Sequence, residues 1–235
     1  MTLYEIFDIQ TSNYLNNKMN KKYKYFYYNI GPNIIGISSG LYVASKIKIT
    51  CPQYKAFPGN FLSGRAKFCR KGFFSFEISS KNKISIISTH LGHSETPQYP
   101  TKSEINSRGK QINMIKQEME VLKQKNKNLT FLVSGDLNMS ENEIEIHEMS
   151  NYLDRGNIPN KFPTWDGDYF SSLISKKPFS AALTLDYTFL SHPSLPVYSL
   201  ETYCESSLFN HKKLDLVSLS DHCGLYSVVS LKKEN

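Results

Sequence analysis

No run of the sequence is apolar enough to cross a membrane, because none approaches the ~18 consecutive apolar residues that a spanning helix needs. The first ten residues, MTLYEIFDIQ, lack the basic region followed by an apolar region that marks a secretory signal peptide. Cysteine is scarce: there are four, and no two form the C-x-x-C spacing of structural zinc sites. The sequence therefore predicts a soluble protein with free thiols and no structural zinc, and it leaves the cellular location unknown.

Tryptophan occurs once, yet the chain is rich in other aromatic residues, with 15 Tyr and 14 Phe. Disordered chains are poor in aromatics, so this composition favours a folded protein. No repeat or low-complexity linker divides the 235 residues, which predicts a single domain over residues 1–235. The net charge of +7 favours polyanionic partners such as nucleic acid, anionic lipid surfaces or phosphorylated substrates, although a solubilising surface explains it equally well.

Helical and β-prone stretches alternate along the chain. Thr101 and Glu104 match a capping box, and apolar residues continue from Ile105 to Leu122 at helical spacing, which predicts a long helix. Further helices are expected over residues 9–22 and, from a second capping box, over residues 140–153. Strands are expected over residues 23–30, 40–45, 47–50, 73–78, 84–89, 129–133, 183–190 and 225–231, with 73–78 and 84–89 as an antiparallel pair. This pattern predicts two sheets packed face to face with helices outside them.

Three short polar clusters lie where apolar strands begin or end: STHLGH at residues 88–93, SGDLNMS at 134–140 and LSDHCG at 219–224. Each cluster alone fits an ordinary turn or a loop salt bridge, but their joint appearance beside β-like runs indicates a functional site. The residue types suit the hydrolysis of a phosphodiester. Carboxylates bind Mg²⁺, histidine serves as a base near neutral pH, and a second carboxylate orients the other nitrogen of that histidine.

The motifs SGDLN, LDYTFLS and LSDHCG, in this order, resemble those of the endonuclease/exonuclease/phosphatase superfamily. STHL, followed by a helix that carries Arg108 and Gln111, fits the same pattern. The resemblance implies an α/β protein, namely a four-layer α/β/β/α sandwich of two mixed, largely antiparallel sheets. Family members carry an additional early strand whose end supplies an Asn to the metal site. Because this chain starts four residues before Glu5, it is expected to lack that first strand, and Tyr4 stands where the family usually has Gln.

The resemblance also implies a role for each matching residue. His222 is the expected general base, with Asp186 orienting it, and His90 is expected to contact the scissile phosphate. The expected catalytic residues are His90, Asp136, Asn138, Asp186, Asp221 and His222. The expected metal ligands are Glu5 and Asp221, with Mg²⁺ as the cofactor and Mn²⁺ as its alternative.

Three more residues are expected on the substrate side: Lys71, Arg108 and Trp165. Lys71 is a candidate for contact with a lipid phosphate, but a solvated lysine is equally expected at this position. Trp165 is either a loop anchor or an aromatic residue beside the substrate.

The segments EIFD, SSGLYVASKIKI and RKGFFSFEI, the last followed by STHL, are similar to those of neutral sphingomyelinases and their bacterial relatives. This similarity implies a monomeric, Mg²⁺-dependent phosphodiesterase that hydrolyses a phospholipid such as sphingomyelin, with an anionic membrane surface as a candidate partner. A DNA endonuclease or exonuclease is an alternative, as is another phosphoesterase such as a phosphoinositide phosphatase. A degenerate membrane-binding module without turnover is a third. Nucleic acid is less favoured, since the sequence has no dense Arg/Lys cluster to follow a phosphate backbone.

Overall fold

The computed structural model describes residues 1–33, 36–78, 84–127, 129–155, 163–166, 182–191, 197–205, 208–211, 215–218 and 220–231. Its helices in these ranges are α1 (Ile9–Met19), α2 (Lys102–Lys125) and α3 (Ile144–Tyr152), with short 3-10 helices η1 (Gly59–Phe61) and η2 (Gly64–Phe68). Its first eight strands are β1 (Thr2–Leu3), β2 (Tyr25–Tyr27), β3 (Tyr42–Ser45), β4 (Ile49–Ala56), β5 (Gly72–Ile78), β6 (Ile84–His90), β7 (Thr130–Asp136) and β8 (Leu153–Arg155). The others are β9 (Trp165–Asp166), β10 (Ala182–Leu183), β11 (Asp186–Ser191), β12 (Val197–Glu205), β13 (Leu208–His211), β14 (Asp215–Ser218) and β15 (Gly224–Leu231). None of the helices in these ranges combines the length and the apolar character that a membrane crossing requires.

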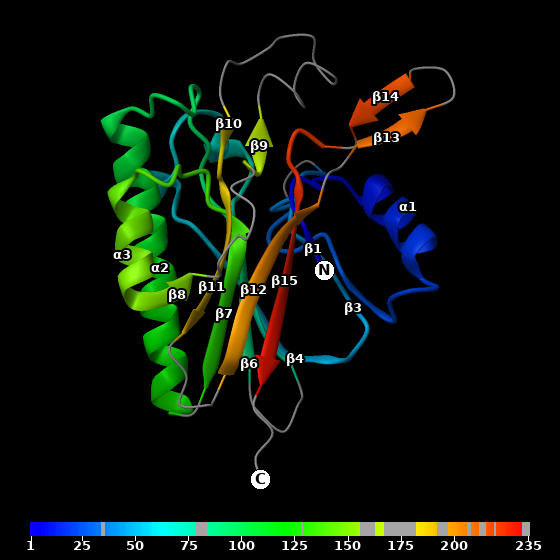
Figure 1. Cartoon of the computed structure of the whole chain (residues 1–235), viewed down its shortest axis with the longest axis horizontal. Coiled ribbons are helices and arrows are strands. Elements are labelled where there is room, and N and C mark those ends of the chain that lie inside the picture. Colours follow the sequence, from blue (N-terminus) through cyan, green and yellow to red (C-terminus); the bar gives the residue numbers. More distant parts are fainter. Residues whose placement is uncertain are drawn as a thin grey trace.

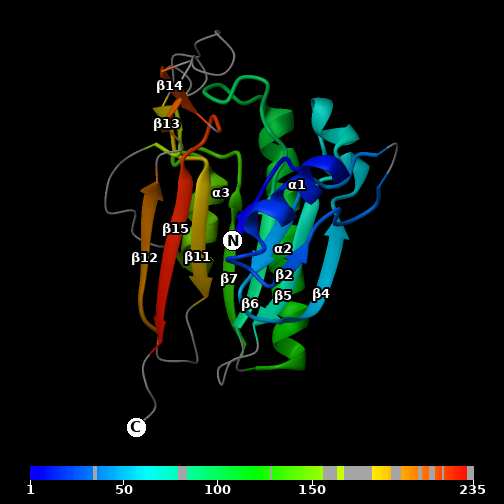
Figure 2. The same cartoon turned by 90° about the vertical axis from the view of Figure 1, so that its right-hand side faces the viewer.

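The elements form four layers, as the sequence predicts (Figure 1). Helices α2 and α3 cover the outer face of a six-stranded sheet whose strand order is β4-β5-β6-β7-β11-β8. The opposite face is covered by the three-stranded group β1-β3-β2 and the pair β12-β15, and α1 lies outside them (Figure 2). The predicted α/β sandwich is therefore confirmed. Within the described residues, the second β layer consists of two groups that share no ladder.

Strand direction in the six-stranded sheet decides where its polar ends meet. β5 pairs antiparallel with β6, as predicted, and β6 runs parallel to β7. β11 then pairs antiparallel with β7. The C-terminal ends of β6 and β7 consequently lie beside the N-terminal end of β11, so these polar residues meet where the central strands of the sheet end. The turn predicted around Lys81 and Asn82 lies outside the described residues.

Alternating side chains of the strands fill two separate apolar cores. On β5, Phe73 points to the core that α2 and α3 cover, where Ile112 and Ile115 pack against it. The next residue, Phe74, belongs to the core between the two β layers, together with Val43. Each face of the six-stranded sheet thus buries its own cluster.

The two predicted capping boxes have different outcomes. At α2, the Thr101 hydroxyl accepts from the backbone N–H of Glu104, and the Glu104 carboxylate accepts from the N–H of Thr101, so this box is confirmed. At the second, Glu143 accepts from the N–H of Ser140, but the Ser140 side chain does not complete the box. α3 therefore begins only at Ile144, and the prediction that a helix starts at Ser140 is wrong.

Gly135 in β7 provides a direct test of the parallel pairing. A Cβ at this position would lie 1.9 Å from the carbonyl oxygen of Thr89 on β6, which no side-chain rotation can relieve. We expect Gly135→Ala to destabilise the fold by more than about 3 kcal/mol, because backbone must move to make room. Gly59→Ala is the matched control, since a Cβ at Gly59 meets nothing within 4 Å.

Urea unfolding of both variants, followed by far-UV circular dichroism, measures the two free energies. A Gly135→Ala protein as stable as Gly59→Ala would contradict the β6–β7 register described above.

Candidate active site

Strand register alone brings three predicted site residues into one row. His90 is opposite Asp136 in the parallel β6–β7 ladder, and Asp136 is opposite Asp186 in the antiparallel β7–β11 ladder. All three side chains are buried, with residue exposures of 2%, 7% and 9% respectively. Two buried carboxylates are therefore held next to each other at the ends of neighbouring inner strands.

His222 reaches this row from the start of β15. Its Nδ1 lies 2.7 Å from Oδ2 of Asp186, within hydrogen-bonding distance. The imidazole keeps 23% of its side-chain surface exposed. The expected convergence of His222 with Asp136 and Asp186 is present, since ligand atoms of the three residues all lie within 4.8 Å of one another.

Thr164, which the sequence reading did not single out, holds this arrangement together. Its hydroxyl accepts hydrogen bonds from the backbone N–H groups of Leu185 and Asp186 at 2.9 and 3.0 Å. Its carbonyl accepts from the N–H of Cys223 at 2.7 Å, while the neighbouring Trp165 forms a β-bridge with His222. Thr164 is fully buried, so one side chain and its own backbone fix both members of the Asp186–His222 pair.

The buried charges shift each other's pKa. Burial and the adjacent Asp186 carboxylate raise the pKa of Asp136 to about 7. For His222, burial disfavours the charged form, but Asp186, Asp136 and Asp221 outweigh burial and raise its pKa to about 10. In the absence of a bound cation, His222 is thus an imidazolium at neutral pH, beside two buried acidic groups.

His90 has the opposite character. Burial, and then the charge of Lys71, hold the pKa of His90 well below its ordinary value, so its ring is neutral. Nζ of Lys71 lies 2.7 Å from Nε2 of His90 and donates to the carbonyl of Leu91 at 2.8 Å. Burial lowers the pKa of Lys71 to about 8, which leaves it mainly charged at neutral pH. Nε2 of His90 also lies 3.3 Å from Oδ2 of Asp136, so this one nitrogen contacts both the ammonium and a carboxylate.

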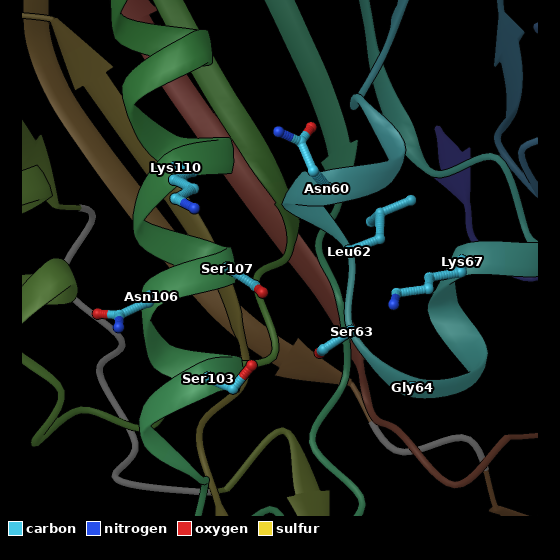
Figure 3. Close-up of a pocket in the computed structure, with 9 residues that line it drawn as sticks. All are labelled: Asn60, Leu62, Ser63, Gly64, Lys67, Ser103, Asn106, Ser107 and Lys110. Atoms are coloured by element: carbon cyan, nitrogen blue, oxygen red, sulfur yellow. The ribbon is translucent and has the colours of Figure 1, made fainter.

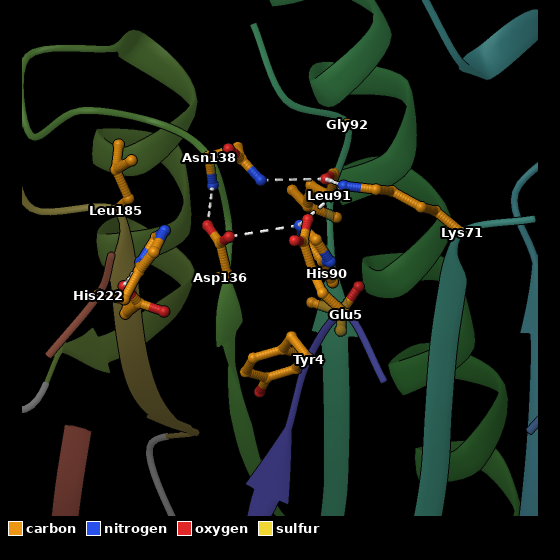
Figure 4. Close-up of polar contacts among 12 residues, drawn as sticks. Tyr4, Glu5, Lys71, His90, Leu91, Gly92, Asp136, Asn138, Leu185 and His222 are labelled. Atoms are coloured by element: carbon orange, nitrogen blue, oxygen red, sulfur yellow. Dashed lines mark hydrogen bonds and ion pairs between the residues drawn. The ribbon is translucent and has the colours of Figure 1, made fainter. Parts of the chain in front are cut away.

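The position of Lys71 excludes one of its two predicted roles, and contact with a lipid phosphate stays a prediction. Lys71 is 1% exposed, so the solvated lysine is wrong. Its ammonium lies against His90 and Leu91, as Figure 4 shows. Lys71 consequently supplies a fixed positive charge next to the row of site residues.

Asn138 continues the network across the loop that follows β7. Its backbone N–H donates to Oδ1 of Asp136 at 2.9 Å, and its side-chain amide donates to the Leu91 carbonyl at 3.2 Å (Figure 4). The residue has a positive φ of 52°, a conformation that Asn tolerates better than most residues. Leu91 thus receives hydrogen bonds from both Lys71 and Asn138, and it ties the ends of β6 and β7 together.

Glu5 and Tyr4 reach the site from the other β layer. Oε1 of Glu5 lies 3.9 Å from Nε2 of His90, and the Glu5 side chain is 65% exposed. The Tyr4 hydroxyl lies 3.2 Å from the Ser88 hydroxyl, and its ring packs edge-on against His90. Tyr4 therefore fixes His90 from the side and carries Glu5 to the open side of the row.

The donor set is suitable for a divalent cation. Asp136, Asp186 and His222 form the group of possible metal ligands found in the described residues, with Glu5 close to the same row. Carboxylate oxygens are the ligands that Mg²⁺ and Mn²⁺ prefer. Burial, and then the adjacent Asp186, raise the pKa of Asp136, and a cation would favour its charged form. Asp221 is exposed and interacts with His222 through charge, and its role as a ligand stays a prediction.

Two substrate-side predictions fall on supporting positions. Arg108 is 1% exposed, and its guanidinium donates to Ser94 and Glu143 inside the protein, so a substrate contact has no support. Trp165 is 6% exposed and bridges to the backbone of His222, which favours the loop-anchor alternative. No sequence motif marked Tyr4 or Thr164 as supporting residues, because their contacts depend on strands far apart in the chain.

No family model matches the chain, and no curated protein matches it. Solved structures do. A beta-toxin variant from Staphylococcus aureus with bound magnesium ions has a TM-score of 0.78 at 21% identity, covering 98% of this chain and 86% of that one. Sphingomyelinase C from Streptomyces griseocarneus has a TM-score of 0.71 at 18% identity, covering 98% and 82%. Truncated TDP2 from Caenorhabditis elegans has a TM-score of 0.68 at 18% identity, covering 98% and 83%. These structures are members of one fold class, and the chain has the endonuclease/exonuclease/phosphatase fold.

Proposed function

We propose that the protein is a divalent-metal-dependent phosphodiesterase that hydrolyses a phospholipid of the sphingomyelin type. The observation that carries this proposal is the hydrogen bond of 2.7 Å between Asp186 and His222, beside the second buried carboxylate Asp136. A histidine whose Nδ1 is held by a carboxylate presents its Nε2 to solvent or substrate, which is the geometry of an oriented general base.

Each residue of the row has a task in such a reaction. His222 takes a proton from the attacking water at Nε2, while Asp186 fixes the tautomer and stabilises the imidazolium that forms. Asn138 and Asp136 position the water and the phosphoryl group. Lys71 holds positive charge behind His90, where it offsets the negative charge that develops on the phosphoryl oxygens.

Glu5 and Asp136 would hold the divalent cation, with Asp221 as a further candidate ligand. The ion would neutralise phosphate charge and offset the carboxylate field that keeps the pKa of His222 at about 10. His222 would then titrate nearer the neutral range, where it acts as a base.

Sequence and structural likeness together favour a phospholipid over DNA. The segments SSGLYVASK and RKGFF are similar to neutral sphingomyelinases, and sphingomyelinase C and beta toxin are among the structures that this fold resembles. The likeness to TDP2 keeps a DNA phosphodiesterase as the second candidate. Both candidates predict the same catalytic row and differ only in what the row cleaves.

A direct comparison of substrates tests the proposal. We expect Mg²⁺-dependent release of phosphocholine from sphingomyelin vesicles to exceed the nicking of plasmid or abasic DNA at equal enzyme concentration. Preferential cleavage of DNA would favour the nuclease instead. Turnover of neither substrate, with binding to anionic vesicles retained, would indicate a degenerate binding module.

Substitutions in the base pair test the mechanism. We expect His222→Ala to lower the turnover rate by about 10²–10⁴-fold, since it removes general-base assistance. Asp186→Asn should also lower the rate strongly, because an amide favours the wrong tautomer of His222. Glu5→Gln should instead raise the Mg²⁺ concentration needed for half-maximal rate. His147→Ala, at an exposed histidine of α3, is the matched control.

Steady-state assays at saturating Mg²⁺, with circular dichroism to verify folding, separate these effects. A His222→Ala enzyme that keeps more than about a tenth of the parent rate would show that another group is the base.

The raised pKa values of Asp136 and His222 predict how the stability of the metal-free protein depends on pH. An acid with a folded pKa near 7 binds its proton more tightly when folded, so the metal-free protein loses stability as the pH rises from about 4 to about 7. The raised pKa of His222 adds stability that is complete below about pH 6.5 and is lost as the pH rises towards 10. Both contributions lower the free energy of unfolding of the metal-free protein as the pH rises.

Asp136→Asn removes the first contribution. At pH 8 without divalent ions, we expect this variant to melt at least about 4 °C above the parent, with the difference shrinking towards pH 4, while its activity is lost. Glu148→Gln, which removes a carboxylate that is 54% exposed, should leave the melting temperature unchanged. A melting temperature for Asp136→Asn below that of the parent across this pH range would show that the charged form of Asp136 does not destabilise the fold.

A further inference from the structure

A pocket of about 580 Å³ lies outside the catalytic row, between the start of α2 and the η1–η2 segment (Figure 3). Its α2 wall is formed by Ser103, Asn106, Ser107 and Lys110, and Lys67 faces them from η2. Carboxylates are absent from its lining, which otherwise consists of hydroxyl, amide, backbone and aliphatic groups. The pocket therefore offers hydrogen-bond donors and two positive charges, without an acidic side chain to balance them.

Both lysines are available to a ligand. Within the described part of the chain, the ammonium groups of Lys67 and Lys110 make no ion pair, and both residues are exposed. Nζ of Lys110 lies 5.8 Å from the ring centre of Phe61, a contact that places the ammonium on the side of η1. One acidic group, Glu95, is close to the pocket, because its Oε1 would lie 3.3 Å from a Cβ at Gly64.

Ser107 adds a hydroxyl to the wall of the pocket. The residue is 8% exposed, and its hydroxyl makes no hydrogen bond within the described residues. In Figure 3, the Ser107 side chain extends from α2 toward the η1–η2 segment, so its unused hydroxyl faces the pocket.

The side chains of the pocket, and not the start of α2, favour an anion. The positive end of the α2 dipole is already balanced by the carboxylate of Glu104, which caps the helix. Lysine, serine and asparagine side chains together match the chemistry of a phosphate group, which accepts several hydrogen bonds and carries more than one negative charge at neutral pH.

We propose that this pocket is a phosphate-binding subsite that is separate from the catalytic row. Its volume exceeds what a phosphate ion fills, which leaves room for the molecule that carries the phosphate. Two sources fit this chemistry: the headgroup of an anionic lipid and a soluble phosphate. The subsite does not depend on the hydrolytic role proposed above, because none of its residues belongs to that row.

A short chain of contacts links the subsite to the catalytic row. Gln111, next to Lys110 on α2, donates to the carbonyl of Phe61 in η1 and accepts from the N–H of Gly92 at 2.9 Å. Gly92 directly follows Leu91, whose carbonyl accepts from Lys71 and Asn138. A ligand in the pocket would therefore contact the same helix and η1 segment that support the loop after His90.

Binding measurements on a matched pair of double variants test the subsite. The pocket variant carries Lys67→Gln and Lys110→Gln, and the control carries Lys46→Gln and Lys48→Gln, two exposed lysines between β3 and β4 with the same loss of charge. Titration calorimetry with inorganic phosphate, in the absence of divalent ions, avoids phosphate binding through a metal in the catalytic row. We expect the pocket variant to lose at least about tenfold in affinity for each lysine removed, while the control binds like the parent.

A vesicle arm distinguishes the two sources. Phosphatidylcholine vesicles with and without phosphatidate are sedimented with each protein. Pocket-dependent binding to phosphatidate vesicles, with or without measurable binding of inorganic phosphate, supports the subsite and assigns it to a lipid headgroup. Pocket-dependent binding of inorganic phosphate alone supports it and assigns a soluble ligand.

Equal loss in the pocket and control variants would overturn the proposal, because it would reduce the effect to net charge. Absence of binding to phosphate and to phosphatidate vesicles by the parent protein would overturn it as well. Turnover of sphingomyelin is not needed for any of these outcomes, so a failed subsite and a failed catalytic proposal give different results.

Discussion

Two carboxylates buried side by side on neighbouring strands are the constraint on which the rest of the site depends. Asp136 and Asp186 are opposite each other in the β7–β11 ladder, so the protein cannot separate them without breaking that pairing. Their repulsion in a poorly hydrated place has to be balanced by positive charge. His222 provides that balance directly, Lys71 provides it from behind His90, and a divalent cation would complete it. The same pair of carboxylates thus destabilises the metal-free fold and provides the oxygens that would bind a cation.

The supporting residues can be understood from the same constraint. Strongly interacting charges are useful only if their geometry is fixed, and the atoms that fix it are mostly uncharged. Thr164 uses one hydroxyl and one carbonyl to hold Asp186 and the segment of His222, and Leu91 uses a single carbonyl to join Lys71 and Asn138. Tyr4 packs its ring on His90 from the second β layer. The two layers therefore meet at the site as well as in the apolar core between them.

The sequence predicted those features that are formed by residues close together in the chain. The α2 capping box, the antiparallel β5–β6 pair and the polar ends of β6, β7 and β15 could be found because each depends on residues close together in the chain. The site as a set required the superfamily resemblance, since no pattern in one segment reveals that β7 pairs with β11. The start of α3 was misplaced because Ser140 uses its backbone, and not its hydroxyl, in the turn before the helix. The burial of Lys71 and the roles of Tyr4 and Thr164 depend on tertiary packing. The spacing of apolar residues along the sequence does not predict such contacts.

The position of His222 just before the start of β15 has a consequence for the order in which the protein is made. Ribosomes deliver β6, β7 and β11 first, so the paired carboxylates can come together while the imidazole that balances them is still unsynthesised. Until β15 is added, the emerging chain carries the repulsion without its counter-charge and has no oriented base. A fragment that ends before β15 would therefore be less stable than the finished fold, because nothing would balance Asp136 and Asp186 from this side.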